Sequence, residues 1–461
     1  MLLPNERIPS CQVETRAGLS SSIGTPQIHR NLDLRSSEFG TTHLTAPPRP
    51  MSREQLIRQA VLLGICDSRL HSFDWVSSLS PRQWTRLLRW LDLSGLALYF
   101  FDRVAGAQQT EPIPAPIFAS LRRRLMENTQ RTHSLIGESI AIQHEFQKAG
   151  LRYAILKGLA FWPSSFSAPN LRLQFDLDYL VAEECMPEAR IILVRRGYRL
   201  YATNGRSWEF KRNERPGIAL KDLYKDTGSW AVELHVESTD AAHTAPLRCV
   251  AWRELWGLAM PVLSPVDLLL GQGLHAYKHV CAEFCRAALL VEFRRHVLFR
   301  YGNDVFWAEL QRQASGNSQA ALRLGVVAHL IAQVMGEFAP ESFTGWTVGR
   351  LPRSARLWVE IYGGRALLGS HPGSKFYLLL EREFESEGIQ AKRSRRQSLL
   401  PSRLPPPIIL PFPNEALPVR LSRYRMQLAL IFCRLRFHLV EGLRFAWESH
   451  RWRRLLGKAA R

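Results

Sequence analysis

Two aspartates separated by one residue stand at the start of a short apolar segment. Asp176 and Asp178 belong to residues 175–181, a stretch that predicts a β-strand. Side chains alternate between the two faces of a strand, so both carboxylates lie on the same face. Two carboxylates that close together are costly unless a cation neutralises them, and the cation that such oxygens suit best is Mg²⁺. The pair therefore predicts a magnesium site and favours nucleotidyl transfer.

The residues around the pair resemble a known family. Leu156-Lys157-Gly158 ends an apolar run, and Arg172-x-x-x-Asp176-Leu-Asp178-x-Leu180-Val181 follows after a variable turn. This arrangement resembles the bacterial "uncharacterised nucleotidyltransferase" family of the DNA polymerase β-like superfamily. The resemblance implies a Mg²⁺-dependent enzyme that moves a nucleoside monophosphate from a nucleotide such as ATP to an acceptor.

The resemblance makes Lys157, Gly158 and Arg172 candidates for nucleotide binding. Lysine offers a point charge and arginine a bidentate fork for phosphate oxygens. Leu159 stands where the superfamily usually has a second small residue, Gly or Ser, after the glycine. We therefore expect Lys157, Arg172 or backbone N–H groups to hold the triphosphate. The alternative is that both cations form ion pairs with nearby acids.

A third carboxylate comes from a later strand. In residues 229–237, alternation puts Glu233, His235 and Glu237 on one face, and Glu233-Leu234-His235 matches an acidic-Leu-His segment of the family. Three carboxylates on neighbouring strands can hold two Mg²⁺ ions. We predict that Asp176, Asp178 and Glu233 do so, that Glu233 completes the site of the ion that activates the acceptor hydroxyl, and that Glu237 is the alternative to Glu233.

Two histidines lie four residues apart in a predicted helix after Pro265. The spacing of His275 and His279 is compatible with a metal ion, but no Glu follows the first histidine as in a zinc protease. We expect a packed or hydrogen-bonded pair, and a role on the substrate side stays open.

These residues need a small mixed β-sheet set between helical segments, so the predicted fold class is α+β. We divide the chain into a disordered segment (1–50), a helical segment (51–150), a nucleotidyltransferase core (151–245), a helical domain (246–387), an Arg/Pro-rich linker (388–418) and a basic amphipathic helix (419–461). Capping patterns at Ser52, Ser80 and Ser264 predict three helix starts.

The charge of the chain is concentrated at its C-terminal end. Of the formal net charge of +20, residues 391–461 carry +13, from 16 Lys or Arg and 3 Glu. This tail could contact an anionic membrane, a nucleic acid or an acidic partner, or it could be a solvated face. Seven scattered cysteines, an N-terminus without a signal-peptide pattern and apolar runs too short to span a bilayer together predict a cytoplasmic protein.

The sequence leaves the acceptor open among a protein side chain, a small molecule, a sugar and an RNA end. Two other function classes compete with the enzyme: an inactive nucleotidyltransferase fold that serves as a binding module, and an adaptor that its basic tail recruits to an anionic surface. P-loop, dinucleotide-binding, serine-nucleophile and zinc-protease motifs are absent from the sequence.

Overall fold

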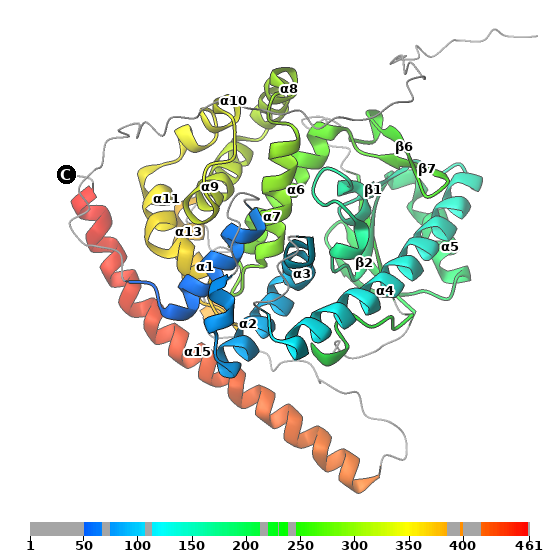
Figure 1. The fold of residues 1–461 in the computed structure, drawn as a ribbon. Coiled ribbons are helices and arrows are strands. Elements are labelled where there is room, and N and C mark those ends of the chain that lie inside the picture. Colours follow the sequence, from blue (N-terminus) through cyan, green and yellow to red (C-terminus); the bar gives the residue numbers. More distant parts are fainter. Residues whose placement is uncertain are drawn as a thin grey trace, which may run out of the picture. The chain divides into compact units, whose positions relative to one another are not determined.

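A mixed seven-stranded β-sheet carries the aspartate pair (Figure 1). The structure is a computed structural model that describes residues 50–66, 74–106, 113–212, 220–228, 230–237, 246–384, 397–399 and 416–459. The predicted disordered segment, residue 50 apart, and most of the predicted linker lie outside these residues. The sheet and its flanking helices confirm the α+β class.

The aspartate strand lies at the centre of the sheet. The strand order is β3-β4-β5-β2-β1-β7-β6. β2 runs antiparallel to β1 and parallel to β5, so the sheet is mixed. The strands are β1 (Tyr153–Leu156), β2 (Asp176–Val181), β3 (Arg199–Asn204), β4 (Ser207–Lys211), β5 (Ala231–Val236), β6 (Ala251–Leu255) and β7 (Leu258–Val262).

Helix α4 (Ala115–Lys148) covers one face of this sheet and joins the N-terminal helices to it (Figure 1). Phe146 of α4 contacts Tyr153 of β1 and Tyr179 of β2 edge-on, with ring centroids 5.2 and 5.6 Å apart. The Tyr179 hydroxyl and Ser139 of α4 share a hydrogen bond of 3.0 Å. Because Tyr179 and Asp178 point to opposite faces, this packing leaves the aspartate face free for chemistry.

The N-terminal helices begin where the capping patterns predict. Ser80 and Gln83 form a capping box, and Ser52 and Gln55 make the corresponding pair of hydrogen bonds. Gly150, in the left-handed region at φ +66°, follows the end of α4. The helices before the sheet are α1 (Arg53–Cys66), η1 (Asp74–Ser78), α2 (Pro81–Ser94), α3 (Ala97–Gly106) and α4.

Helices also follow the sheet. Ser264 caps the first of them, as predicted, by accepting a hydrogen bond from the backbone N–H of Asp267. The helix within the sheet region is α5 (Met186–Arg195), and those after it are α6 (Pro265–Val280), α7 (Ala287–Phe299), α8 (Asp304–Ser315), α9 (Ser318–Met335), α10 (Glu341–Thr344), α11 (Arg353–Trp358), the π-helix η8 (Val359–Gly363), α12 (Gly364–Leu367) and α13 (Tyr377–Phe384).

The basic C-terminal segment is one long helix, α15 (Leu417–Ala459), and its second half is docked. Trp452 is only 1% exposed, and its indole N–H donates to Glu383 of α13 over 3.3 Å. Glu448 accepts a hydrogen bond from the Tyr362 hydroxyl at 3.0 Å, and Arg434 pairs with Glu283 at 3.0 Å. Within the part of the chain that the structure describes, neither α15 nor another helix has the length and apolar character needed to cross a membrane.

Candidate active site

The register of β2 and β5 brings two carboxylates side by side. These strands run parallel, with Asp178 paired to Glu233 and Leu180 paired to His235. Leu177, Tyr179, Val232 and Leu234 fill the core on the opposite face. Alternation along both strands therefore leaves the polar residues together on the free face.

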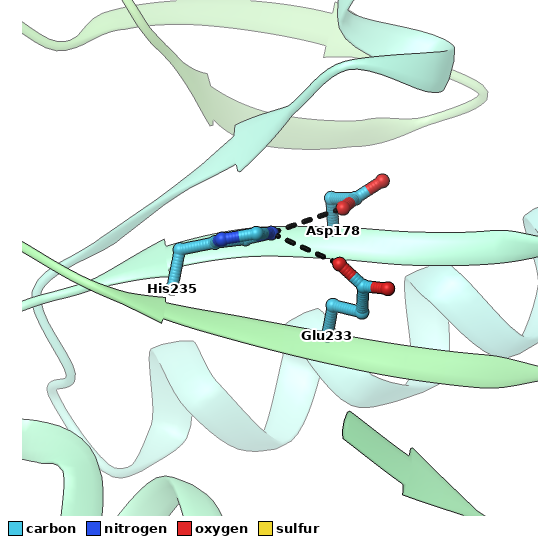
Figure 2. Close-up of side chains that lie close together, drawn as sticks. All are labelled: Asp178, Glu233 and His235. Atoms are coloured by element: carbon cyan, nitrogen blue, oxygen red, sulfur yellow. Dashed lines mark hydrogen bonds and ion pairs between the residues drawn. The ribbon is translucent and has the colours of Figure 1, made fainter. Parts of the chain in front are cut away.

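Asp178, Glu233 and His235 converge there, as Figure 2 shows. The His235 Nε2 atom lies 3.1 Å from Asp178 Oδ1 and 3.3 Å from Glu233 Oε2. One ligand atom from each residue falls within 4.8 Å of the other two, and no other group of three such residues does so among the described residues. The Asp178 side chain is 2% exposed, whereas Glu233 and His235 are 27% and 26% exposed, so solvent and ligands can reach the group.

Lys157 completes the group from the end of β1. Its backbone lies in the left-handed region at φ +50°, which is uncommon for lysine, and its Nζ is 2.7 Å from Asp178 Oδ1 and 3.9 Å from Glu233 Oε2. Burial opposes the lysine charge, but the charge and hydrogen bond of Asp178, together with the charges of Asp176 and Glu233, outweigh it and raise the pKa of Lys157. A side chain at Gly158 would overlap Gln174, so the turn after Lys157 requires glycine.

Contacts within the group shift the pKa values of Asp178 and His235 in opposite directions. Burial would raise the pKa of Asp178, but the hydrogen bonds and charges of His235 and Lys157 together outweigh it and hold that pKa below its ordinary value. Burial would lower the pKa of His235, and the hydrogen bonds to Asp178 and Glu233 raise it instead. Asp178 is therefore a carboxylate throughout the neutral pH range.

Asp176 is different, because it lies on the same face but outside the converging group. Neither a hydrogen bond nor an ion pair joins its carboxylate to any residue that the structure describes. Burial and the charge of Asp178 raise the pKa of Asp176 to about 6. A half-buried carboxylate without a partner, beside a second one, has the environment expected of a cation ligand.

The sequence profile of the "Uncharacterised nucleotidyltransferase" family matches residues 80–336, which is more than half of the chain. The chain belongs to this family. The crystal structure of an antigenic nucleotidyltransferase-like protein from Paracoccidioides brasiliensis is similar to it, with 12% sequence identity, 44% of this chain and 93% of that chain covered, and a TM-score of 0.27. No curated protein matches the sequence.

In this nucleotidyltransferase-family protein, Arg172 forms an ion pair with Glu292, and Lys157 forms one with Asp178. Such ion pairs were the alternative to phosphate binding, but the sequence did not indicate Glu292 as the partner. The Arg172 Nε donates to Glu292 of α7 at 3.1 Å, and its Nη1 donates to Gln174 at 3.0 Å. The Tyr99 hydroxyl of α3 donates to the other oxygen of Glu292 at 3.0 Å. The Arg172 charge also acts on Asp176 and lowers its pKa. Glu292, which comes 120 residues later in the sequence, therefore holds Arg172 beside the aspartate strand.

His275 and His279 of α6 pack against each other edge-on, with ring centroids 4.8 Å apart. Burial lowers the pKa of His275 to about 3 and that of His279 to about 4. The charge of Lys157 also lowers the pKa of both rings. The packed pair agrees with the sequence expectation, and no third metal-ligating residue joins it among the described residues.

Two residues of the site had no assigned role at the sequence level. His235 was placed on the correct face, and its Leu-His context was the available signal, but only the strand register shows its contact with Asp178. Glu292 carried no signal, since a single glutamate in a helix resembles any solvated one. Glu237, the alternative to Glu233, instead accepts a hydrogen bond from the Leu247 N–H at 2.7 Å.

Proposed function

We propose that this protein is a nucleotidyltransferase that transfers a nucleoside monophosphate from an NTP to a hydroxyl acceptor, using divalent metal bound by Asp176, Asp178 and Glu233, with two Mg²⁺ ions expected. Family membership supports the reaction class. The observation that carries the metal requirement is the charge balance on the free face, where three carboxylates face the ammonium of Lys157 and one of them, Asp176, forms neither a hydrogen bond nor an ion pair with a described residue.

The bound metal would supply a more nucleophilic acceptor oxygen and neutralise charge on the leaving pyrophosphate. Asp178 and Glu233 would hold it at the solvent-accessible end of the group, and Asp176 would add the negative charge that a second ion needs. Lys157 would turn from Asp178 to a phosphate oxygen, a change within reach of its flexible side chain. Gly158 lets the backbone approach the phosphates closely.

The Arg172 side chain would move less than that of Lys157 when a nucleotide binds. Its Nε and Nη1 are engaged by Glu292 and Gln174, whereas its Nη2 makes no hydrogen bond with a described residue. We assign Nη2 to a phosphate oxygen. Because Glu292 holds the guanidinium in place, such a contact would cost little side-chain entropy.

The test is binding and turnover of NTPs by the full chain. Each of the four NTPs, labelled at the α-phosphate, is titrated with Mg²⁺ and again with EDTA. We expect at least one NTP to bind only with the metal, and its label to pass to a component of a cell lysate. Lack of metal-dependent binding for all four NTPs would contradict the proposed function.

A separate observation favours a second role for α15. Leu421, Leu428, Phe432, Leu435, Leu439 and Leu443 are exposed and form one stripe at helical spacing. At 3.6 residues per turn, this stripe lies opposite the buried residues Phe437, Glu441 and Trp452. The helix carries 10 Lys or Arg and 2 Glu.

We propose that this stripe binds an anionic lipid membrane. The excess of positive charge attracts anionic headgroups at about 1 kcal/mol for each Lys or Arg near the surface, and it repels a second copy of the same helix. The exposed leucines would then enter the headgroup boundary, as in other helices that lie in the membrane plane.

Sedimentation of the full chain with lipid vesicles tests this role. We expect binding to phosphatidylglycerol vesicles, little binding to phosphatidylcholine vesicles, and at least tenfold weaker binding for Phe432→Asp/Leu439→Asp. Met126→Asp, which introduces a charge at an exposed methionine of α4, is the matched control. Equal sedimentation of the double variant would contradict the proposal, as would self-association through α15 without vesicle binding.

A further inference from the structure

We propose that His235 is a nitrogen ligand of the catalytic metal, and that the site consequently binds a first-row transition ion such as Mn²⁺ more tightly than Mg²⁺. This inference rests on the proposed function and deepens it. The sequence assigned only carboxylates to the metal; the structure brings an imidazole to the same point (Figure 2).

The spacing of the three ligand atoms carries the inference. Neighbouring ligands around a six-coordinate ion with bonds of about 2.1 Å lie about 3 Å apart. His235 Nε2 is 3.1 Å from Asp178 Oδ1 and 3.3 Å from Glu233 Oε2. One ring nitrogen therefore stands at ligand spacing from both carboxylates at once.

The strand geometry fixes this arrangement. Asp178 and Glu233 are register partners on parallel strands, and His235 comes two residues after Glu233, on the same face of β5. The imidazole has to fold back along the face for its Nε2 to meet both acids. A histidine that only supported Asp178 would need contact with one carboxylate.

A second, independent observation points to a cation at this place. The carboxylate of Asp176 shares the face with Asp178 and has no hydrogen bond or ion pair within the described part of the chain. Lys157 pairs with Asp178 at 2.7 Å and with Glu233 at 3.9 Å, and these ion pairs do not include Asp176. An added cation would therefore meet one carboxylate without an ion pair beside two that share one ammonium.

The ligand set then decides which ion fits. Mg²⁺ takes oxygen ligands almost exclusively and keeps much of its water, whereas imidazole suits first-row transition ions. Two carboxylates and one imidazole retain enough hard oxygen for Mn²⁺ while adding a nitrogen bond that Mg²⁺ uses poorly. Nitrogen ligation would therefore raise affinity for Mn²⁺ selectively.

Pulsed electron paramagnetic resonance of Mn²⁺ added to the full chain tests the ligand directly, without an activity assay. We expect bound Mn²⁺ to show coupling to ¹⁴N, and protein with ¹⁵N-labelled histidine to show ¹⁵N coupling in its place. The labelling excludes the Lys157 nitrogen and needs no substitution. In titrations, His235→Gln should bind Mn²⁺ at least tenfold more weakly, and its Mg²⁺ affinity should change less than about threefold.

His144→Gln, which changes an exposed histidine of α4, serves as the control and should leave both affinities unchanged. Bound Mn²⁺ without histidine nitrogen coupling would overturn the ligand assignment and leave the metal site of the proposed function intact. Nitrogen coupling that persists in His235→Gln would also overturn the assignment of His235 as a ligand. An equal loss of Mn²⁺ and Mg²⁺ affinity in this variant would overturn it as well. Failure of the wild-type protein to bind either ion would contradict the proposed function as well.

Discussion

Replacing Asp178 by asparagine is expected to lower the rate of nucleotidyl transfer at least about a thousandfold. Asp178 is the point where the Lys157 ammonium, at 2.7 Å, and the His235 ring, at 3.1 Å, meet on a side chain that is only 2% exposed. Asparagine keeps the size of aspartate but removes its charge, so it cannot hold a divalent ion in this group. The measurement is the rate of label transfer from the NTP that binds the wild-type protein.

The loss of transfer can be attributed to the Asp178 charge only if the Asp178→Asn variant still folds. Asp222→Asn makes the same chemical change at a partly exposed aspartate that pairs with Lys225 at 2.8 Å, and we expect transfer to be unchanged. Thermal unfolding of both variants shows whether the sheet remains intact. Transfer by Asp178→Asn within tenfold of the wild-type rate, with normal unfolding, would remove Asp178 from the catalytic group.

The strands that carry the site could be predicted because their signal is local. An apolar run with polar residues at every second position specifies both the strand and its faces, and β2 begins within one residue of the predicted start. Helix starts were equally accessible, since a capping serine and a Gln three residues later act within one turn.

Contacts between distant segments could not be predicted in this way. The pairing of Arg172 with Glu292 depends on how α7 packs beside the aspartate strand, and a glutamate on a helix gives no sign of its partner. The position of His235 depends on the register between β2 and β5, because a shift of one residue would move it to the other face.

The C-terminal helix shows the same limit. Its periodicity predicts an amphipathic helix but not which side is docked. Trp452 and Phe437 are buried against the protein, whereas the more regular leucine stripe is exposed. The sequence contains two apolar faces, and only the packing of Trp452 near Glu383 and Tyr362 distinguishes them.

Asparagine in place of Asp176 is expected to have opposite effects on stability and on metal binding. The folded protein raises the pKa of Asp176 from near 4 to about 6, mainly through burial and then through the charge of Asp178. Between these values the folded protein keeps a proton that the unfolded chain has released, so the free energy of unfolding falls as the pH rises through this window. Above this pH window, Asp176 is charged in the folded protein, and the full cost of burying that charge lowers the free energy of unfolding.

Asp176→Asn avoids that cost because it carries no charge. In EDTA, it should be more stable than the wild-type protein by about 2 kcal/mol at pH 8 and by much less at pH 4. The upper limit for such a pKa difference is about 3 kcal/mol, and water reaching the half-buried carboxylate reduces it. Urea unfolding at a series of pH values gives the comparison.

Added divalent metal should reverse the order of stability of the wild-type protein and Asp176→Asn. An ion that binds only the folded state stabilises it by about 4.1 kcal/mol at one thousand times its dissociation constant, and the variant, which should bind it at least about a hundredfold more weakly, would gain only about 1.4 kcal/mol. Wild-type protein would then be the more stable of the two at pH 8. A variant that is less stable in EDTA would show that Asp176 has a structural partner, and equal stabilisation by metal would show that Asp176 is not a ligand. Only a carboxylate held in place for a cation predicts both results together: a variant that is more stable than the wild-type protein in EDTA and less stable than it with bound metal.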